Sequence, residues 1–528
     1  MSKLAFMALP SILLLSACAS KQIHEQPRFF TANGTLLLDP DGRAVILNGV
    51  NTGNTGKVPP MIGWQTREDY LKLRSWGFNH VRMVFVWEGI EPQPGQYDEA
   101  YLQRLAERVA WCREAGLLVI LDAHQDLYSR KYGADGAPAW ACLDDGLPLG
   151  PTRTPWGLNY FHPPVMKAYD NFWLNAPGPG GIGVQDRFIA AWREVARRFK
   201  DETCVLGYDL LNEPFFGSDA TAVMLSGVKA AAGILGVKEQ MALLKLAQAD
   251  DPVAELRKIA RHFDDVGTVE KFLDAMGEGP VRDFEMRKLQ PFYDRAVTAI
   301  REVDPNHIIF MEPVTGTGPG IWSGLRRPQN PATGRPHANI AFAPHYYEVS
   351  SEFGQEYQNN PARMRALLTR AATTAQRLQM PLWVGEWGAP SPACVSDELF
   401  WRHHLDSFDE ILAGRSFWDW CPELDKRPYF HHIARPYFPA VAGTDISVKV
   451  SGNRISLRFT GSPQGGVTTT WIPSWLTPDF TATREDGTPL QAREASPGGL
   501  REFIIPPAAG TCAIAVSLYE TEVQSAAR

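Results

Sequence analysis

Two glutamates stand at the ends of apolar runs that have the length of buried strands. Glu213 follows VLGYDLLN, and Glu386 lies inside PLWVGEWG. A carboxylate at the tip of a buried strand is costly unless it has chemistry to perform. Cleavage of an acetal with retention of configuration needs one protonated and one ionised carboxyl group, about 5 Å apart across the bond. The two glutamates are far apart in the sequence, so only the fold can bring them together.

The neighbours of these glutamates predict their roles. Arg82 and Tyr347 are expected to hold Glu386 as a carboxylate, by charge and by hydrogen bonding. The negative charge on Glu386 would then raise the pKa of Glu213 and keep it protonated. We therefore expect Glu213 to be the acid/base and Glu386 the nucleophile. Asn212 is placed to hydrogen-bond a sugar 2-hydroxyl.

Other predicted strands also end in polar residues. His124 is expected to line the same pocket, and Glu312, in FMEP, is a rival carboxylate for which we expect a supporting role. One polar strand end is explained by a solvated loop, but many that converge indicate a functional site. These residues are Arg82, His124, Asn212, Glu213, Glu312, His345, Tyr346, Tyr347, Glu386 and Trp418.

The elements that must position these residues alternate between helix and strand. YLKLRSWGFNHVRMVFVW and YLQRLAERVAWCREAGLLVILDAH each join an amphipathic helix to an apolar strand through a glycine, Gly77 or Gly116. AVILNGVN supplies the first strand, and VLGYDLLNE, HIIFMEP, NIAFAPHYY, PLWVGEWG and RSFWDW supply later ones. Eight such strands, with no Gly-rich phosphate loop after the first, predict an α/β fold, a (β/α)8 barrel over residues 29–440.

Two long segments interrupt the barrel on the side where its active site is expected. Residues 125–184 are rich in Gly, Pro and aromatics, and residues 217–290 are predicted to be helical. Both segments are too apolar to be disordered, so we interpret them as lids. For residues 217–290 we favour packing on the barrel wall over direct contact with lipid. After about residue 440, short alternating strands with a hairpin at Gly452-Asn453 predict a small antiparallel β-sandwich over residues 441–522, which we expect to brace the barrel.

The N-terminus resembles a bacterial lipoprotein signal. MSKLAFMALPSILLLSAC has a basic residue, an apolar run too short to span a bilayer, and small residues directly before Cys18. Residues 1–18 are thus a predicted signal with its acylated Cys18, and residues 19–28 a tether. We expect an exported lipoprotein on a membrane of the bacterial cell envelope, at the outer membrane or the periplasmic face. The alternative is an ordinary secretory signal in which Cys18 occurs by chance.

Composition excludes several classes of function. A net charge of −7 and a pI near 6.0 give no reason to expect nucleic acid, and we expect a monomer. The six cysteines beyond Cys18 permit disulfides but select no pairing. No Cys/His spacing resembles a zinc site, so no metal is expected.

The motifs, taken in order, resemble glycoside hydrolase family 5 of clan A. NEP at a strand end, PHYY, GEWG and a final FW follow the pattern of that retaining family. Within it, LDAHQDLYS, GAPAWACLDDGLP, NYFHPPVMKAYDNFW and LGYDLLNEPF are similar to endoglycoceramidases and related glucosylceramidases. NEP alone is a weak signal, whereas the ordered series is strong and covers about residues 29–520.

The resemblance implies an acid/base at Glu213 and a nucleophile at Glu386. It also implies contacts to the sugar or the nucleophile from Lys57, Asp122, His124, Asp126, Trp156, Asn212, Tyr347 and Trp418. Lys57 by itself would be taken for a solvated loop lysine, so its role rests on the resemblance. The insertion at 217–290 departs from the bacterial endoglycoceramidases, which leaves glycan length and aglycone open.

The sequence therefore predicts a membrane-anchored retaining β-glycosidase that cleaves a sugar–lipid bond, such as that of a glucosylated ceramide, without a cofactor. One alternative is an endo-β-glucanase or mannanase of the same family, which would act on polysaccharides. Another is a glycolipid-binding lipoprotein without catalysis, which the intact Glu213, Glu386 and Arg82 argue against.

Overall fold

The computed structural model describes residues 29–154, 156–236, 238, 241, 261–315, 320–348, 356–389, 392–495 and 500–520. The predicted signal and tether, with Cys18, lie outside the described residues, as does much of the middle of the 217–290 insertion. Within the described residues no helix is long and apolar enough to cross a bilayer. The six cysteines of this part are free thiols.

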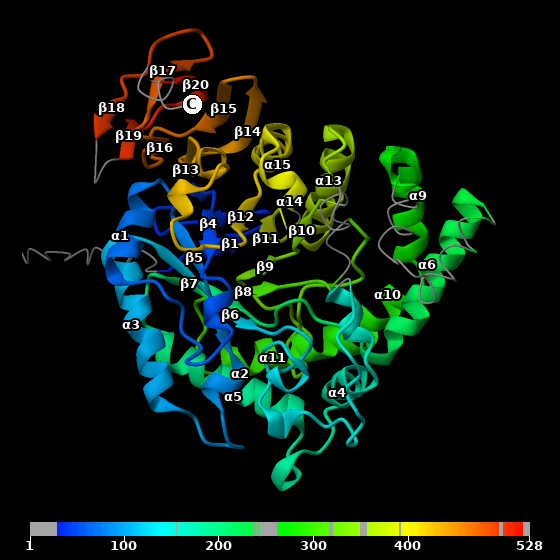
Figure 1. The fold of residues 1–528 in the computed structure, drawn as a ribbon. Helices are drawn as coiled ribbons and strands as arrows, with labels where there is room; N and C mark the ends of the chain where they lie inside the picture. The colour runs from blue at the N-terminus through cyan, green and yellow to red at the C-terminus, as the bar shows by residue number, and fades with distance from the viewer. Residues whose placement is uncertain are drawn as a thin grey trace, which may run out of the picture.

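Nine parallel strands form the barrel, in the order β10-β11-β12-β4-β5-β6-β7-β8-β9. Figure 1 shows them in the middle of the larger domain, surrounded by helices. Their bounds are β4 Asn48–Asn51, β5 His80–Val86, β6 Leu118–His124, β7 Val205–Asp209, β8 Ile308–Met311, β9 Ile340–Phe342, β10 Tyr346–Tyr347, β11 Trp383–Gly388 and β12 Gly414–Phe417.

Residues 340–347 close the barrel as one interrupted strand. β9 pairs with β8, and β10 pairs with β11. Between them, the N–H of Phe342 donates to the carbonyl of Pro381 at 2.9 Å, and the N–H of Gly385 donates to that of Pro344 at 3.1 Å. β9 and β10 together therefore act as one strand, and the predicted (β/α)8 barrel is confirmed.

The helices outside the barrel follow the predicted helix, glycine and strand order. α3 begins after Asp98, whose side chain accepts from the N–H of Tyr101, and ends at Gly116 in the left-handed conformation, with φ of 72°. α1 ends just before Gly77, whose φ is 95°. The principal helices are α1 Arg67–Ser75, α3 Glu99–Ala115, α5 Val184–Phe199, α11 Gln290–Arg301, α13 Pro361–Leu378 and α15 Glu398–Glu410.

The two insertions differ in structure. Residues 125–184 consist of short 3-10 turns, among them η4 Trp156–Phe161, followed by α4 Pro163–Trp173. The described part of 217–290 holds α6 Ala220–Leu235, α9 Val266–Gly277 and α10 Pro280–Phe284, and Figure 1 shows α6 and α9 side by side at one flank. α9 buries Val269 and Leu273 in the same apolar cluster as the barrel, so this helix packs on the barrel as expected.

A β-sandwich lies beside the barrel (Figure 1). Its four-stranded sheet has the order β14-β15-β20-β17, and its seven-stranded sheet the order β1-β2-β3-β13-β16-β19-β18. Apolar residues of both sheets, such as Val441 and Ile472 of one and Ile455 and Ile514 of the other, share a core. The bounds are β1 Thr31–Asn33, β2 Leu36–Leu38, β3 Ala44–Val45, β13 Tyr437–Val441, β14 Gly443–Ser451, β15 Arg454–Gly461, β16 Thr468–Pro473, β17 Leu476–Arg484, β18 Arg493–Ala495, β19 Leu500–Ile505 and β20 Gly510–Glu520.

The seven-stranded sheet contains strands from the start of the chain as well as strands from its C-terminal part. β3 pairs antiparallel with β13, so Val45 lies opposite Ala440. The predicted first strand, AVILNGVN, is consequently divided, because Ala44–Val45 joins the sandwich and only Asn48–Asn51 joins the barrel. The apolar pattern of this run could not show that its two halves pair with different sheets.

The chain enters the described structure at the amino ends of the barrel strands. Phe29 packs edge-on against His307, which directly precedes β8, with ring centroids 5.0 Å apart. The N–H of Ala32 donates to Oδ1 of Asn339, which directly precedes β9, at 3.1 Å. Phe30 packs against a cluster of buried apolar residues to which Ile308 belongs. Residues 29–38 thus cover the end of the barrel opposite to the carboxyl ends of its strands.

Candidate active site

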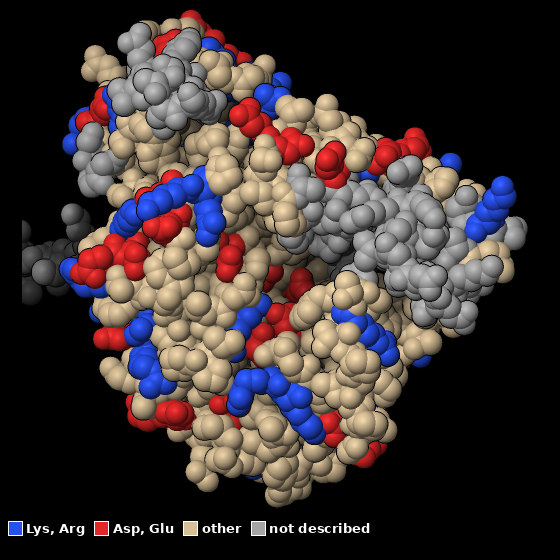
Figure 2. Space-filling model, in the orientation of Figure 1, with Lys and Arg blue, Asp and Glu red and all other residues tan. Residues whose placement is uncertain are grey.

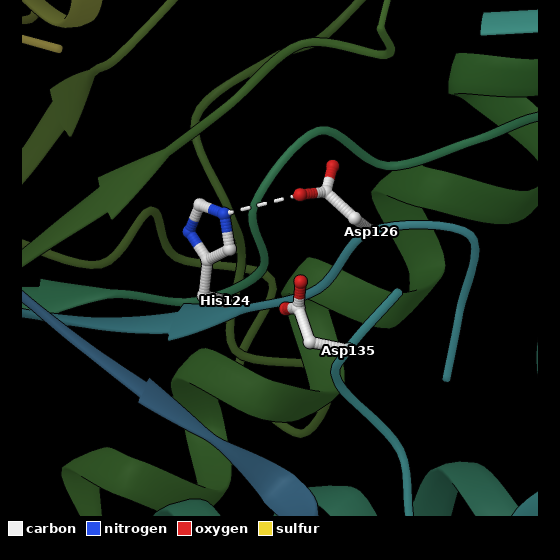
Figure 3. Close-up of side chains that lie close together, drawn as sticks. All are labelled: His124, Asp126 and Asp135. Atoms are coloured by element: carbon white, nitrogen blue, oxygen red, sulfur yellow. Dashed lines mark ion pairs between the residues drawn. The ribbon is translucent and has the colours of Figure 1, made fainter. Parts of the chain in front are cut away.

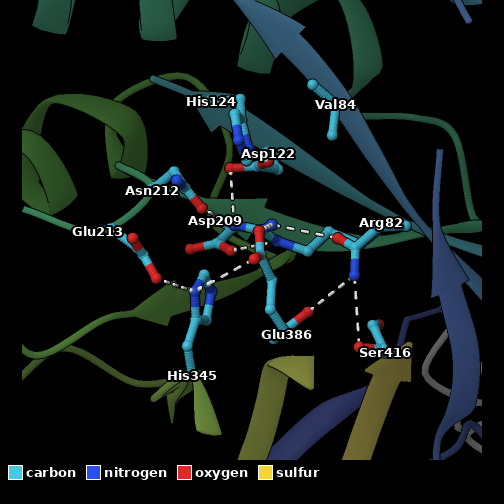
Figure 4. Close-up of polar contacts among 12 residues, drawn as sticks. Arg82, Val84, Asp122, His124, Asp209, Asn212, Glu213, His345, Glu386 and Ser416 are labelled. Atoms are coloured by element: carbon cyan, nitrogen blue, oxygen red, sulfur yellow. Dashed lines mark hydrogen bonds and ion pairs between the residues drawn. The ribbon is translucent and has the colours of Figure 1, made fainter. Parts of the chain in front are cut away.

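Arg82 lies at the centre of a polar network inside the barrel, near the carboxyl ends of the strands (Figure 4). Its side chain comes from β5 and is fully buried. Its guanidinium donates to Asp209 at 2.9 Å and to Glu386 at 2.7 Å. A buried cation of this kind needs several partners, and side chains from five other strands or strand ends supply them. The remaining contacts are to Asn51, Asp122, Asn212 and Glu312, at 2.9 to 3.1 Å.

Glu386, on β11, is held as a carboxylate. Its Oε1 accepts from Arg82, and its Oε2 accepts from the hydroxyl of Tyr347 at 2.9 Å. Burial would raise the pKa of Glu386, but the charges of His345 and Arg82 outweigh burial and leave that pKa below its ordinary value. Both neighbours predicted from the sequence, Arg82 and Tyr347, are therefore in contact with Glu386.

Glu213 follows β7 in a constrained conformation and has the opposite pKa shift. Its φ is 41°, and its N–H donates to Oε2 of Glu312 at 2.8 Å. Burial raises the pKa of Glu213, His345 partly opposes this, and the charge of Glu386 adds to it. The upward shift of the Glu213 pKa agrees with the expectation from the sequence. Burial contributes more to this shift than the charge of Glu386, because the site is more enclosed than the positions at strand ends alone indicate.

His345 lies between the two glutamates, as Figure 4 shows. Its Nδ1 is 3.0 Å from Oε1 of Glu213 and 3.7 Å from Oε2 of Glu386, and its Nε2 is 3.1 Å from Glu312. Burial opposes a charge on His345, but Glu312 and Glu386 raise its pKa well above the ordinary value. One oxygen of Glu213, one of Glu386 and one nitrogen of His345 all lie within 4.8 Å of one another.

Glu312 has the geometry of a supporting residue. It is almost fully buried and contacts Arg82, His345 and the backbone of Glu213. Because both of its oxygens are occupied by these groups, Glu312 orients the residues around it and presents no free oxygen to a substrate.

A second group of residues consists of Lys57, His124, Asp126 and Trp418, and we call it the sugar wall because the resemblance to family 5 implies that its members contact a sugar. Lys57 Nζ lies 2.7 Å from Asp126 Oδ2 and 4.3 Å from the centre of the Trp418 ring. The rings of His124 and Trp418 stack, with centroids 5.3 Å apart. Burial and Lys57 oppose protonation of His124, but Asp122, 2.7 Å away, raises its pKa to about 9. Lys57 is thus part of the site and is not a solvated loop lysine.

Three further residues predicted from the sequence lie around the sugar wall and Arg82, each in a different position. Asp122 is fully buried beneath His124 and Arg82, so it supports the wall and does not line it. The side chain of Asn212 accepts from Arg82 and donates to the carbonyl of Gln125. Trp156 is half exposed and packs edge-on against Tyr160, whose hydroxyl donates to Asp126 at 3.3 Å, so Trp156 stands at the outer edge of the site.

Sequence reasoning missed Asp135, which lies beside the sugar wall (Figure 3). The backbones of Asp126 and Asp135 pair through two hydrogen bonds of 3.2 Å, and a carboxylate oxygen of each lies within 4.8 Å of a ring nitrogen of His124. Burial and the charge of Asp126 raise the pKa of Asp135 to about 7. A loop aspartate in GADGAP carries no signal of this pairing.

Asn51 and Asp209 were also missed, although a signal for them exists. Asn51 is the last residue of β4 and Asp209 the last residue of β7, and both are fully buried on Arg82. Asp209 precedes Leu210, Leu211 and Asn212 in the same apolar run as Glu213, so a polar residue within such a run could have been counted with the strand ends.

The carboxyl ends of the strands open into a hollow. Figure 2 shows a depression near the middle of this face, with acidic side chains inside it and Lys or Arg side chains along part of its edge. We call this end of the barrel the mouth. Two carboxyl groups with opposite pKa shifts, close together at the carboxyl ends of the barrel strands, suit acid-assisted displacement at an acetal carbon.

Comparisons with known proteins agree with this geometry. The family model described as "Cellulase (glycosyl hydrolase family 5)" matches residues 38–424. Endoglycoceramidase I of Rhodococcus hoagii is 26% identical to this chain, over 86% of this chain and 82% of that protein. A glucosylceramidase of Aspergillus fumigatus is 29% identical over 34% of this chain and 32% of its own length. The structure of endo-glycoceramidase II from Rhodococcus sp. in its ganglioside GM3 complex is similar with a TM-score of 0.67 and 26% identity, over 91% of this chain and 99% of that chain.

Proposed function

The chain belongs to glycosyl hydrolase family 5, and from this premise we propose that it hydrolyses the β-glycosidic bond between a sugar and a lipid, with retention. The observation that carries the proposal is the pair of carboxyl groups at Glu213 and Glu386, which we call the reacting pair. Oxygens of the two lie within 4.8 Å of each other, and their pKa values are shifted in opposite directions. This is the separation that suits a covalent intermediate and leaves no space for a water molecule in between.

In the first step Glu386 attacks the anomeric carbon, and Glu213 gives its proton to the glycosidic oxygen, so the lipid alcohol leaves. In the second step Glu213, now ionised, takes a proton from water, and the water oxygen displaces Glu386. His345 and Arg82 stabilise the carboxylates in both steps, and Lys57, His124, Asp126 and Trp418 hold the sugar. The reaction requires no cofactor.

A lipid is the proposed aglycone because of the surface around the mouth and the nature of the relatives. Val58 and Trp156 are 53% and 50% exposed, and both belong to segments that contact Asp126 through Lys57 or Tyr160. Apolar groups at an opening accommodate an apolar leaving group. Endoglycoceramidases and a glucosylceramidase are among the proteins that this chain resembles.

The test is to incubate the protein with glucosylceramide, lactosylceramide, a ganglioside and a steryl glucoside in detergent, and with carboxymethylcellulose. We expect a released sugar from at least one glycolipid, first as the β-anomer by NMR, and little from the polysaccharide. Turnover of the polysaccharide alone would favour an endoglucanase, and binding of glycolipid with no turnover would favour a non-catalytic lipoprotein.

We also propose that the chain is exported and held on a bacterial membrane by acyl chains on Cys18. The small residues before Cys18 and the short apolar run support this. Radiolabelled palmitate should enter the wild-type protein and not Cys18→Ala. Equal labelling of the two would leave an ordinary secretory signal as the better explanation.

A further inference from the structure

We propose that the mouth acts on a lipid bilayer other than the one that holds the acyl chains. This inference rests on the proposed glycolipid activity and on the proposed anchor at Cys18. It follows from the position of Phe29, the length of chain before it, and the direction in which the site opens.

The anchored end and the mouth are at opposite ends of the barrel. Strand β8 shows this directly, because Phe29 packs on His307 just before the strand, whereas Glu312 just after it binds the backbone of Glu213. The contact of Ala32 with Asn339, just before β9, places residues 29–33 at the same end as His307. The tether therefore joins the body on the side away from the reacting pair.

The tether is too short to turn the mouth towards its own membrane. Phe29 follows Cys18 by 11 residues, which reach at most roughly 40 Å when fully extended. A compact chain of this length has a radius of gyration of roughly 23 Å and is therefore about 60 Å across. With the mouth against the anchoring bilayer, Phe29 would lie at the far end of the barrel, and the tether would have to pass around the outside of the body. At roughly 40 Å, the extended tether is shorter than the body diameter of about 60 Å.

Two apolar side chains, those of Val58 and Trp156, are exposed near the sugar wall. Val58 directly follows Lys57, and the Trp156 ring packs on Tyr160, so both exposed side chains stand around the sugar wall. Aromatic and aliphatic groups of this kind suit the boundary between headgroups and acyl chains. A bilayer that presents glycolipid headgroups to the mouth would contact these residues first.

Dilution kinetics distinguish the two arrangements. Lipidated full-length protein is reconstituted into phosphatidylcholine vesicles that also contain glucosylceramide and lactosylceramide. If the mouth reaches only other vesicles, turnover requires an encounter between vesicles, and a tenfold dilution should lower the rate per enzyme about tenfold. If the mouth reaches its own bilayer, dilution should leave the rate per enzyme unchanged, and the inference is overturned.

A lengthened tether provides the decisive variant. About 60 Gly/Ser residues inserted between Glu25 and Gln26 add roughly 40 to 45 Å of average reach and roughly 200 Å at full extension. We expect this variant to turn over glycolipid at a rate that does not depend on dilution. The matched control carries the same insertion after Gly487, in an exposed turn of the sandwich, and should behave like the unmodified chain. A lengthened tether that still shows the full dilution effect would also overturn the inference.

Failure of the proposed function gives a different result. In detergent micelles the anchor imposes no orientation. The unmodified protein, the variant with the lengthened tether and the control with the insertion after Gly487 should therefore release sugar at similar rates. No release in micelles would contradict the glycolipid activity itself. Release in micelles together with dilution-independent turnover in vesicles would contradict only the inference about the second bilayer.

Discussion

The reacting pair and the sugar wall are neighbours at the mouth, but they are held in different ways. Glu213 and Glu386 stand at strand ends and share contacts with buried groups of the barrel, above all Arg82, His345 and Glu312. Lys57 and Asp126 come from loops after β4 and β6, and their charges pair with each other. The barrel framework thus fixes the reacting atoms, whereas two of the four residues of the sugar wall, Lys57 and Asp126, come from loops. We expect substitutions in the first group to act on kcat and those in the second on KM.

The largest effect is expected from Glu386→Gln. This substitution keeps the shape of the side chain but replaces the attacking carboxylate with a neutral amide, so kcat on a glycolipid or an aryl β-glucoside should fall by about 10⁴-fold or more. Steady-state kinetics on both substrates measure this, and the circular dichroism spectrum controls for folding. A rate equal to that of the wild type would contradict the proposed mechanism.

Glu213→Gln should have the next largest effect on the rate, and this effect should depend on the leaving group. Loss of general acid catalysis costs about 10²- to 10⁴-fold with a lipid alcohol, but much less in the first step with a dinitrophenyl leaving group. In the wild type, activity requires protonated Glu213, whose pKa is raised, so kcat/KM should decline as pH rises through that pKa. The variant should lack this alkaline decline, and an unchanged pH profile would assign the decline to another group.

Tyr347→Phe should have a smaller effect on the same pair. It removes the hydrogen bond to Oε2 of Glu386, and one bond to a charged group accounts for about 1.5–3 kcal/mol, or roughly 10- to 150-fold in kcat. The pKa of Glu386 should rise without this donor, so the acid limb of the kcat/KM profile should move to higher pH. An unmoved acid limb would show that Tyr347 does not stabilise the carboxylate.

Lys57→Met tests the other side of the comparison. We expect KM for the glycolipid to rise about tenfold with kcat nearly unchanged, because a contact made equally in the ground state and the transition state affects binding alone. Lys131→Met is the matched control, since Lys131 pairs with Asp144 in the adjacent loop and contacts no residue of the sugar wall. A fall in kcat with constant KM would instead place Lys57 with the reacting pair.

The smallest effect is expected from Asp135→Asn, in the pH dependence of stability. The folded-state pKa of Asp135 is about 7, above the unfolded value of about 3.9, so the folded state holds the extra proton between these values. Stability contributed by this group therefore falls as pH rises from about 4 to about 7. The variant lacks this loss, so its Tm relative to wild type should be higher at pH 8 than at pH 5, by a few degrees. A constant difference would show that Asp135 titrates normally.

The same contrast explains what could be predicted from the sequence. Glu213, Glu386 and Arg82 are detectable because each interrupts or ends an apolar strand, and the barrel then dictates that such ends converge. Asp135 is not detectable, because it lies in a polar loop and reaches the sugar wall only through the pairing of its backbone with Asp126. Likewise, His345 is visible as a strand end, but its position between two glutamates depends on the interruption between β9 and β10.

The pairing of β3 with β13 determines when the first strands of this protein can complete their folding. Residues 36–45 leave the ribosome early, yet their partner at 437–441 is made almost 400 residues later. Contacts between distant parts of a chain form slowly. Until that late partner arrives, the early strands have an unpaired edge, so the chain completes its native structure only after nearly all of it has been synthesised. A truncation near residue 435 should therefore damage the start of the protein as well as its end.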